Sequence, residues 1–489
     1  MIKEVIENKK RIHKKMNQTL NATYEKKYSE IIEPIYGPRG QFFYNDISYL
    51  HEYSITKKDR VNMTMYEVYS IDPPLCEDAD DAFSIYYDNN KLFLAIHIAD
   101  PTDYIRLNSN MWICIQSLLT TKYPSNRKPI HMMPPSVLES SSLMDNKKGN
   151  IKKAISIVTE INEENYSPCG RVELKFTMIK LKKENAYTYK QAGNIIKDKD
   201  KMEFEIALNI GKYLYKKRSE NTKGAKLSDL SPSHIKYKNN EITIEKDSEE
   251  ERQMKKMISE FAIFANSFVG NYLKVHLNTG MFRSCIANDW LDNLEDDIGG
   301  KDMLQEIISN GIKAEYVSDV KPHDLVGMPE YTHFTSPLRR VSDCICHYLL
   351  KYIYYRNYYG TYPIPFTNDY LKLISDKCIK NAKKDRNNQY LDNKFRYLQV
   401  MDNILEIKAC LKITYYITSY SGLFLNIIIC NINEHEIYMS YVLRVKNYNK
   451  KIIYKEKNTI QITHVNCFEK FDNNTIPELD HYILHCDEL

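Results

Sequence analysis

Long apolar runs, paired cysteines and glycine are all scarce in this sequence of 489 residues, and each shortage excludes a class of protein. No window holds the 18 uncharged apolar residues of a membrane span, because the best candidate, Leu423–Ile432, is short and interrupted by Asn426. The eleven cysteines are odd in number, widely spread and without a Cys-x-x-Cys pair, which excludes a disulfide framework and a zinc ribbon. The 15 glycines form no Gly-rich phosphate loop. The N-terminus also lacks the apolar core of a signal peptide.

The remaining composition is that of an ordinary globular protein, with 27% charged and 43% hydrophobic residues. The length predicts about three domains. A net charge of +4 is too mild to indicate a nucleic-acid binder, and the 39 tyrosines are interpreted mostly as codon bias. The first 30 residues contain eight Lys/Arg against four Glu, which predicts a basic helical segment with a solvated face.

Apolar periodicity predicts strands in the first part of the chain and helices later. Strands are expected over Tyr66–Ile71, Ala82–Tyr87 and Lys91–Ala99, and a strand-rich stretch over Ala154–Leu181. Helices are expected over Met254–Leu277, from Pro337 to about Tyr355, and over Asp369–Lys412. Short β-rich runs follow at Leu423–Cys430, Ile437–Leu443 and Lys451–Tyr454. The order predicts an α+β protein, in which a large mixed α/β unit precedes a small β-barrel.

The densest group of acids lies between two predicted strands and follows a turn at Pro73-Pro74. Its members are Asp72, Glu77, Asp78, Asp80 and Asp81. Carboxylates that converge raise each other's pKa because their negative charges repel. A bound divalent cation offsets this repulsion. Hard oxygen ligands of this kind suit Mg²⁺ or Mn²⁺. A solvated acidic turn is the alternative, whereas a calcium-binding EF-hand would need a Gly and a terminal Glu that are missing here.

Two adjacent arginines, Arg339 and Arg340, follow a pattern that predicts the start of a helix. Ser336 suits the N-cap and Pro337 the first helical position. The arginines would then lie in the first turn, where the helix dipole disfavours cations and a bound phosphate would offset the conflict. The alternative is a surface helix with an ion pair between Arg339 and Asp343. Acids that hold metal and arginines that hold phosphate together indicate hydrolysis of a phosphodiester.

Both segments resemble signatures of the ribonuclease II family, the RNB-domain exoribonucleases. The acidic signature of that family begins with Ile-Asp and has aspartates at the spacing found here between Ile71 and Ala82. Ala95–Asp100 is similar to the strand that follows, and Tyr331–Arg340 resembles the element Tyr-x-His-Phe-Thr-Ser-Pro-hydrophobic-Arg-Arg. Looser similarities occur at Tyr123, Met133-Pro134, Ala186–Tyr189, Glu260, Asn266 and Arg283. The resemblance covers about residues 60–400.

The resemblance implies a metal-dependent, hydrolytic 3′→5′ exoribonuclease that degrades single-stranded RNA processively to 5′-mononucleotides. It implies that Asp80 and Arg339 are catalytic residues. It implies that the ligands of Mg²⁺, or of Mn²⁺, are Asp72, Asp78, Asp80 and Asp81. It implies RNA contacts for Tyr123, Tyr189, Glu260, Arg283, Ser336 and Arg340. A catalytically weak or inactive RNA-binding protein with the same fold, acting in an RNA-processing complex, is the alternative, and a nuclease that trims structured or specific RNAs is a variant of the first reading.

The same resemblance predicts three parts: a short basic segment over residues 1–57, an RNB catalytic domain over 58–403, and an OB-like, S1-type RNA-binding barrel over 404–489. The family usually carries two cold-shock domains before the catalytic domain, where this sequence has only about 57 residues. We therefore expect the basic Lys9–Lys27 segment to help capture RNA. Single-stranded RNA and a helicase or another RNA-processing protein are the expected partners. We expect a cytoplasmic monomer without membrane attachment, with an organelle or a viral context left open.

Overall fold

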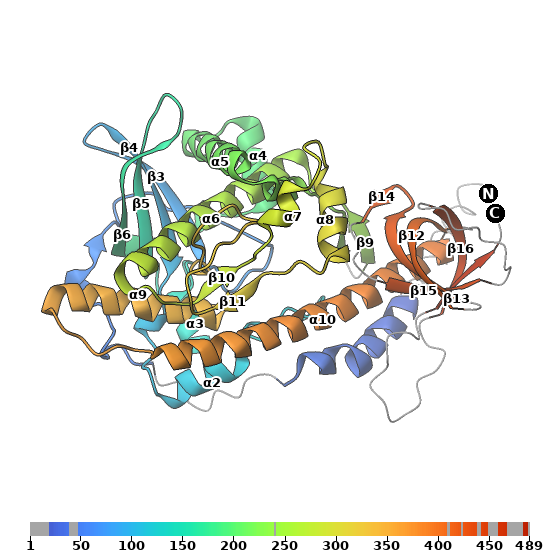
Figure 1. Ribbon diagram of the computed structural model, residues 1–489, viewed down its shortest axis with the longest axis horizontal. Coiled ribbons are helices and arrows are strands. Elements are labelled where there is room, and N and C mark those ends of the chain that lie inside the picture. Colours follow the sequence, from blue (N-terminus) through green and yellow to red (C-terminus); the bar gives the residue numbers. More distant parts are fainter. Residues whose placement is uncertain are drawn as a thin grey trace, which may run out of the picture.

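A five-stranded sheet supports the acidic segment (Figure 1). The computed structural model describes residues 19–38, 47–238, 241–407, 411–421, 424–437, 442–447, 458–466 and 483–487. The strand order is β1-β6-β5-β4-β3, with β1 parallel to β6 and the other neighbours antiparallel. The strands are β1 Val61–Asn62, β3 Asp81–Asp88, β4 Lys91–Ala99, β5 Ile151–Ile161 and β6 Pro168–Lys180. The predicted strand over Lys91–Ala99 is confirmed at both ends, and the one over Ala82–Tyr87 is one residue longer at each end.

A two-residue turn fixes the register of β3 on β4. Asn89 and Asn90 have φ angles of 49° and 60°, a region that asparagine tolerates better than most residues and that tight hairpin turns require. Asp88 is paired with Lys91, so that Asp81, at the other end of β3, lies opposite Ile98. The turn therefore determines where the acidic segment enters the sheet.

A short parallel pair brings the first acidic residue beside the start of a helix. β2 Ser70–Asp72 pairs with β7 Ala186–Thr188, and Asp72 lies opposite Thr188. Thr188 then caps α4 Tyr189–Asp198 in a capping box with Gln191. The predicted strand Tyr66–Ile71 is much shorter than expected, because only its last two residues enter β2.

Long helices cover the sheet and cross the molecule (Figure 1). α6 Glu249–Leu277 contains the predicted helix and begins five residues earlier, because Ser248 and Glu251 form a capping box and three glutamates occupy the first turn. The other helices are α2 Asn110–Leu118, α3 Pro135–Ser141, α5 Met202–Asn221, α7 Asn288–Asp292, α8 Gly300–Ser309, α9 Val341–Tyr359 and α10 Asn368–Ile407. Two further strand pairs are β8 His234–Lys238 with β9 Glu241–Glu245, and β10 Phe282–Ser284 with β11 Glu315–Val317. Among the residues given above, no helix is both long and apolar enough to span a bilayer.

The strands after α10 pair in a ring. They are β12 Leu411–Ser421, β13 Phe424–Ile432, β14 His435–Glu436, β15 Val442–Asn447, β16 Asn458–Asn466 and β17 Ile483–Asp487. β12 pairs with both β13 and β16, and β17 pairs with both β15 and β16, while β13 also pairs with β15. Residues 424–430 of the predicted strand Leu423–Cys430 lie in β13, and the last two residues of the predicted strand Ile437–Leu443 lie in β15. Leu423, residues 438–441 and Lys451–Tyr454 lie outside the described residues. The predicted boundary at residue 403 falls inside α10.

The N-terminal helix, over residues 19–31, is solvated on one side only. It lies beside the second half of α10 (Figure 1). Tyr24 and Tyr28 are fully buried there and form edge-to-face contacts with Phe395. The charge pattern of the segment predicted a solvated face, but it gave no indication of this buried tyrosine face, because buried tyrosines do not change the net charge.

Candidate active site

The two segments singled out in the sequence meet at Asp80. Its Oδ1 atom accepts a hydrogen bond from the backbone N–H of Leu338 at 2.7 Å, and its Oδ2 atom accepts one from Nε of Arg339 at 3.2 Å. Asp80 is buried, and burial raises its pKa well above the usual range although Arg339 and the Leu338 N–H act in the opposite direction. The structure thus joins two residues that are 259 positions apart in the chain.

Arg339 is held on one side and open on the other. Its Nη2 atom donates to the Ser336 hydroxyl at 2.8 Å, while Asp80 accepts from Nε. The side chain is nevertheless 43% exposed. A guanidinium group fixed in this way can use its remaining N–H groups for an anion in the adjoining space.

The predicted helix start at Pro337 is wrong, because the helix begins at Val341. Arg340 has an extended backbone and pairs with Thr120, and its Nη2 atom donates to Asp343 at 2.8 Å. Asp343 also accepts the backbone N–H of Ser336 at 2.8 Å, so the expected N-cap is bonded elsewhere. The alternative ion pair between Arg339 and Asp343 is wrong for the same reason. The backbone pairing of Arg340 with Thr120 outweighs the local sequence preference for a helix that starts at Pro337.

Asp72 and Asp81 lie half-buried at the ends of β2 and β3. Burial and the neighbouring Asp81 charge raise the pKa of Asp72 to about 7, and burial raises the pKa of Asp81 to about 6. The thiol of Cys76 lies 3.8 Å from Asp72 Oδ1 and 3.7 Å from Asp78 Oδ1, which places these two carboxyl groups around one side chain.

The acidic side chains have the right donor atoms for a divalent cation, but their present positions suit one less well. Asp72, Asp78 and Asp81 offer only oxygen donors, and a cation would relieve the mutual repulsion that raises the pKa of Asp72. In the described part of the chain, however, no three His, Cys, Asp or Glu side chains converge closely enough to hold a metal ion as they stand. Side-chain rotations would have to accompany binding.

Tyr123 and His131 complete this side of the site. The Tyr123 hydroxyl donates to Asp78 Oδ2 at 2.7 Å, and burial together with the Asp78 charge raises the pKa of this phenol well above its usual range. His131 lies 3.6 Å from Glu77 and 3.8 Å from Asp78, and neither ring nitrogen has a hydrogen-bond partner among the residues that the structure describes. His131 is not among the residues predicted from the sequence, and its place two residues before Met133-Pro134 is the only signal that points to it.

The remaining predicted RNA contacts occupy different environments. Tyr189 is the first residue of α4 and follows Thr188, which lies opposite Asp72. Burial together with the Asp81 and Asp72 charges raises the pKa of Tyr189. Arg283 lies with its guanidinium 4.7 Å from the Tyr316 ring centroid, and its backbone N–H donates to Tyr331 at 2.8 Å. Glu260, in contrast, is 1% exposed and has both oxygens bonded to Arg218, at 3.0 and 2.5 Å.

α6 supports the loop that carries Arg339. Asn266 accepts the backbone N–H of Phe334 at 2.8 Å and donates to the Tyr331 hydroxyl at 3.1 Å. One turn later, Gly270 approaches the loop backbone so closely that a Cβ atom would lie 3.1 Å from the Glu330 carbonyl carbon and from the Tyr331 nitrogen. A backbone contact of this kind cannot be relieved by a side-chain rotation.

Gly270→Ala is therefore expected to destabilise the protein by about 1–3 kcal/mol and to displace the loop that carries Arg339. Denaturant unfolding measures the first effect. Gly280→Ala is the matched control, because its Cβ would meet the end of the Leu273 side chain at 3.1 Å, which can move. Equal stability of the two variants would contradict the close approach.

A buried charge cluster lies behind this loop. Arg60, Asp100, Asp103 and Lys351 all have fully buried side chains. Arg60 bonds Asp100 at 2.6 Å and Asp103 at 3.0 Å, and Lys351 lies 2.8 Å and 3.2 Å from the same two carboxylates. His347, 3.9 Å from Asp100, contacts the Phe334 carbonyl oxygen at 3.0 Å, so the cluster reaches the loop.

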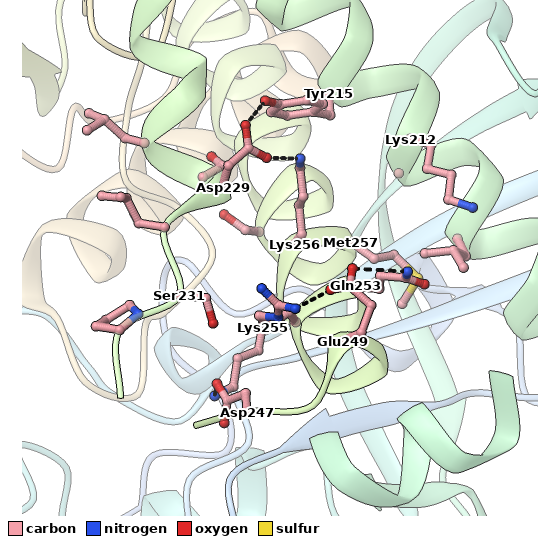
Figure 2. A pocket seen from close by; sticks show the side chains of 18 of the residues that line it. Lys212, Tyr215, Asp229, Ser231, Asp247, Glu249, Gln253, Lys255, Lys256 and Met257 are labelled. Atoms are coloured by element: carbon pink, nitrogen blue, oxygen red, sulfur yellow. Dashed lines mark hydrogen bonds and ion pairs between the residues drawn. The ribbon is translucent and has the colours of Figure 1, made fainter. Parts of the chain in front are cut away.

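A separate hollow of about 620 Å³ lies between α5 and the first turns of α6 (Figure 2). Its charges are largely paired within it: Asp229 accepts from Tyr215 and lies 2.5 Å from Lys256, and Lys255 lies 2.5 Å from Asp247. The Lys255 ammonium also lies 5.6 Å from the Tyr189 ring, which places the hollow next to the acidic site. None of the four aspartates of the acidic segment lines it.

Known proteins resemble this chain in sequence and in fold. Exoribonuclease 2 of Buchnera aphidicola is 25% identical over an alignment of 340 residues that covers 60% of this chain and 50% of that protein. A structure of Mycoplasma genitalium RNase R in complex with ribose-methylated single-stranded RNA superposes with a TM-score of 0.67 at 16% identity, over 91% of this chain and 74% of that one. Yeast Ssd1, a pseudonuclease, superposes with a TM-score of 0.58 at 17% identity, over 77% and 50%.

These structural likenesses show the fold, and the chain spans about half the length of the curated relative. The decisive match is to the RNB domain, which covers residues 60–356 and therefore more than half of the sequence. The meeting of Asp80 with Arg339 falls within it. The chain belongs to the RNB-domain family.

Proposed function

We propose that this chain is a metal-dependent 3′→5′ exoribonuclease that degrades single-stranded RNA processively and releases 5′-mononucleotides. The observation that supports this most strongly is the contact between Asp80 and the half-exposed Arg339, with Asp78 and Tyr123 beside it. A carboxylate next to an anion-binding guanidinium is the arrangement that hydrolysis of a phosphodiester needs.

The residues of the chain have distinct tasks in this proposal. Arg339 binds a non-bridging oxygen of the scissile phosphate, and Asp80 fixes the direction of its guanidinium plane. Burial raises the pKa of Asp80, which favours its holding a proton. Asp72, Asp78, Asp80 and Asp81 are the proposed ligands of Mg²⁺ or Mn²⁺, which would supply an activated water and charge neutralisation when bound.

RNA binding is proposed at aromatic and basic side chains around the site. Tyr123, which is 40% exposed, and Tyr189 can stack on bases without sequence preference, whereas Arg283 and Arg340 add positive charge. Ser336 acts by holding Arg339, and Glu260 by holding Arg218. We also propose that the ring of strands after α10 is an OB-like, S1-type barrel that contacts RNA, that the protein works as a cytoplasmic monomer, and that a helicase or another RNA-processing protein is its partner.

The alternative is an RNA-binding protein with this fold that does not cleave. The likeness to yeast Ssd1, a pseudonuclease, is the observation in its favour. Against it stands the presence of all four aspartates and both arginines, together with the contact between Asp80 and Arg339, which a protein without catalytic activity would have no need to keep.

A digestion time course on 5′-labelled poly(A), with and without a chelator, tests the proposal. We expect shortening from the 3′ end without a ladder of released intermediates, and complete loss of turnover with chelator, restored by excess Mg²⁺ or Mn²⁺. Release of mononucleotides is checked on a 3′-labelled strand. RNA that is bound but stays intact with either metal present would favour the alternative.

A further inference from the structure

The loop that carries Tyr123 is tied down at its base and at its tip. At the base, the backbone N–H of Thr121 donates to the Arg339 carbonyl at 3.0 Å, and Lys122 and Ile130 exchange backbone hydrogen bonds of 3.0 and 2.8 Å. The tip, Ser125–Arg127, is held by side chains from distant parts of the chain. Tyr123 lies between the two attachments, two residues before the tip.

A single buried carboxylate organises the tip. Asp392 of α10 is 1% exposed, and its Oδ2 atom accepts three hydrogen bonds: from the Ser125 backbone N–H at 2.8 Å, from the Tyr28 hydroxyl at 2.8 Å and from the Tyr36 hydroxyl at 2.7 Å. Tyr28 lies on the N-terminal helix, and Tyr36 ends the 3₁₀ turn η1 Glu33–Tyr36 that follows. The N-terminal segment and the loop thus share one acceptor atom.

Two arginines, Arg127 and the fully buried Arg396, add further contacts between the tip, the N-terminal segment and α10. Arg127, in the tip, donates to Glu25 at 2.7 Å, to Ser29 at 3.1 Å and to Glu33 at 3.3 Å, all in the N-terminal segment. Arg396 of α10 donates to the Ser125 carbonyl at 3.0 Å and to Glu25 at 2.6 Å. Both guanidinium groups lie over the Tyr28 ring, at 4.8 and 3.7 Å from its centroid.

We propose that the N-terminal helix is a positioning element of the active site, which holds the 121–130 loop and, through it, the Tyr123 hydroxyl on Asp78. This rests on the proposed nuclease function, in which Tyr123 contacts RNA beside the acidic residues. The helix acts at a distance and touches no substrate. Displacing a group of this kind by about 1 Å can cost up to about a hundredfold in rate, because the reacting groups no longer align.

Two substitutions loosen the tip, and a third is their matched control. Arg127→Gln removes the contacts from the tip to Glu25 and Glu33, and Tyr28→Phe removes one donor to Asp392. Tyr24→Phe removes a hydrogen bond of the same kind and length, 2.8 Å to Asp402, from the same helix to α10 but away from the loop. General damage to helix docking would affect Tyr24→Phe and Tyr28→Phe alike.

Hydrogen exchange and turnover are measured on the full chain. Arg127→Gln and Tyr28→Phe are expected to speed amide exchange over residues 122–128 and to lower the turnover rate about tenfold or more, with Tyr24→Phe at the wild-type level. In a Tyr123→Phe background, Arg127→Gln is expected to cause little further loss of turnover, because the two changes act through the same hydroxyl.

The outcomes separate this proposal from the proposed function. If the wild-type protein releases no nucleotide, the nuclease proposal fails, and exchange over residues 122–128 alone decides on the positioning role. Unchanged exchange in Arg127→Gln, an equal effect of Tyr24→Phe and Tyr28→Phe, or a full multiplicative loss when Arg127→Gln is added to Tyr123→Phe would each overturn it.

Discussion

Asp80→Asn is expected to slow mononucleotide release from a 3′-labelled single strand by about 10³-fold or more, while RNA affinity stays nearly unchanged. The substitution removes the charge that orients Arg339 and puts an amide N–H group where the guanidinium Nε–H now donates. It leaves the side-chain volume and the acceptor for the Leu338 N–H in place, so the loop keeps its main attachment. Single-turnover rates and a binding titration separate chemistry from affinity.

Asp88→Asn is the control for this variant. Asp88 is the last residue of the same strand, β3, and is exposed, so the change removes the same charge outside the site. We expect its rate to match that of the unmodified protein. A comparable loss in both variants, or unchanged turnover in Asp80→Asn, would remove Asp80 from the mechanism.

Asp100→Asn is expected to lower the free energy of unfolding by about 3–5 kcal/mol, since breaking a buried ion network leaves charges without a counter-ion. The fully buried Arg60 and Lys351 would then share Asp103 as their remaining carboxylate in the cluster. Denaturant unfolding at neutral pH gives the difference. Glu52→Gln is the control: Glu52 pairs with Arg106 at 3.5 Å on the surface, and losing this pair should change stability by less than about 1 kcal/mol.

The cost of Asp100→Asn should depend on pH in one direction. Although burial alone would raise it, the charges of Lys351 and Arg60 hold the pKa of Asp100 well below its usual range. An acid with a lowered pKa in the folded state stabilises fully above its unfolded pKa and loses that contribution as the pH falls toward the folded pKa. The gap between wild type and variant should be full above about pH 5 and narrow below about pH 4. A gap that widens in acid would show that Asp100 is not the stabilising carboxylate.

The sequence predicts best those helices and strands whose limits depend on residues nearby in the chain. β4 begins and ends where alternation of apolar residues predicted it, because the Asn89-Asn90 turn and the sheet edge fix the same limits. α6 is longer than its apolar periodicity, since its first turn is charged and depends on the capping box at Ser248. The helix start at Pro337 failed because Arg340 pairs with Thr120, some 220 residues earlier, which no local signal records.

The candidate site, too, can be predicted from the sequence only in part. The spacing of the acids and the paired arginines predicted a phosphodiester-cleaving site, and the structure brings Asp80 and Arg339 into contact. The roles assigned to individual residues stay predictions. The sequence could not indicate that Tyr28 and Tyr36 would bond a carboxylate more than 350 residues away, because single hydrogen bonds leave no periodic or compositional trace. From composition alone, the 39 tyrosines are interpreted mostly as codon bias.

The length of α10 has a mechanical consequence. A helix of 40 residues is about 60 Å long, and it runs from beside α2 to the ring of strands (Figure 1). Because of this length, a tilt of about 3° at its first turn would carry its far end about 3 Å. The N-terminal helix packs against the second half of α10, far from that first turn. At this distance a given contact force resists the tilt most effectively.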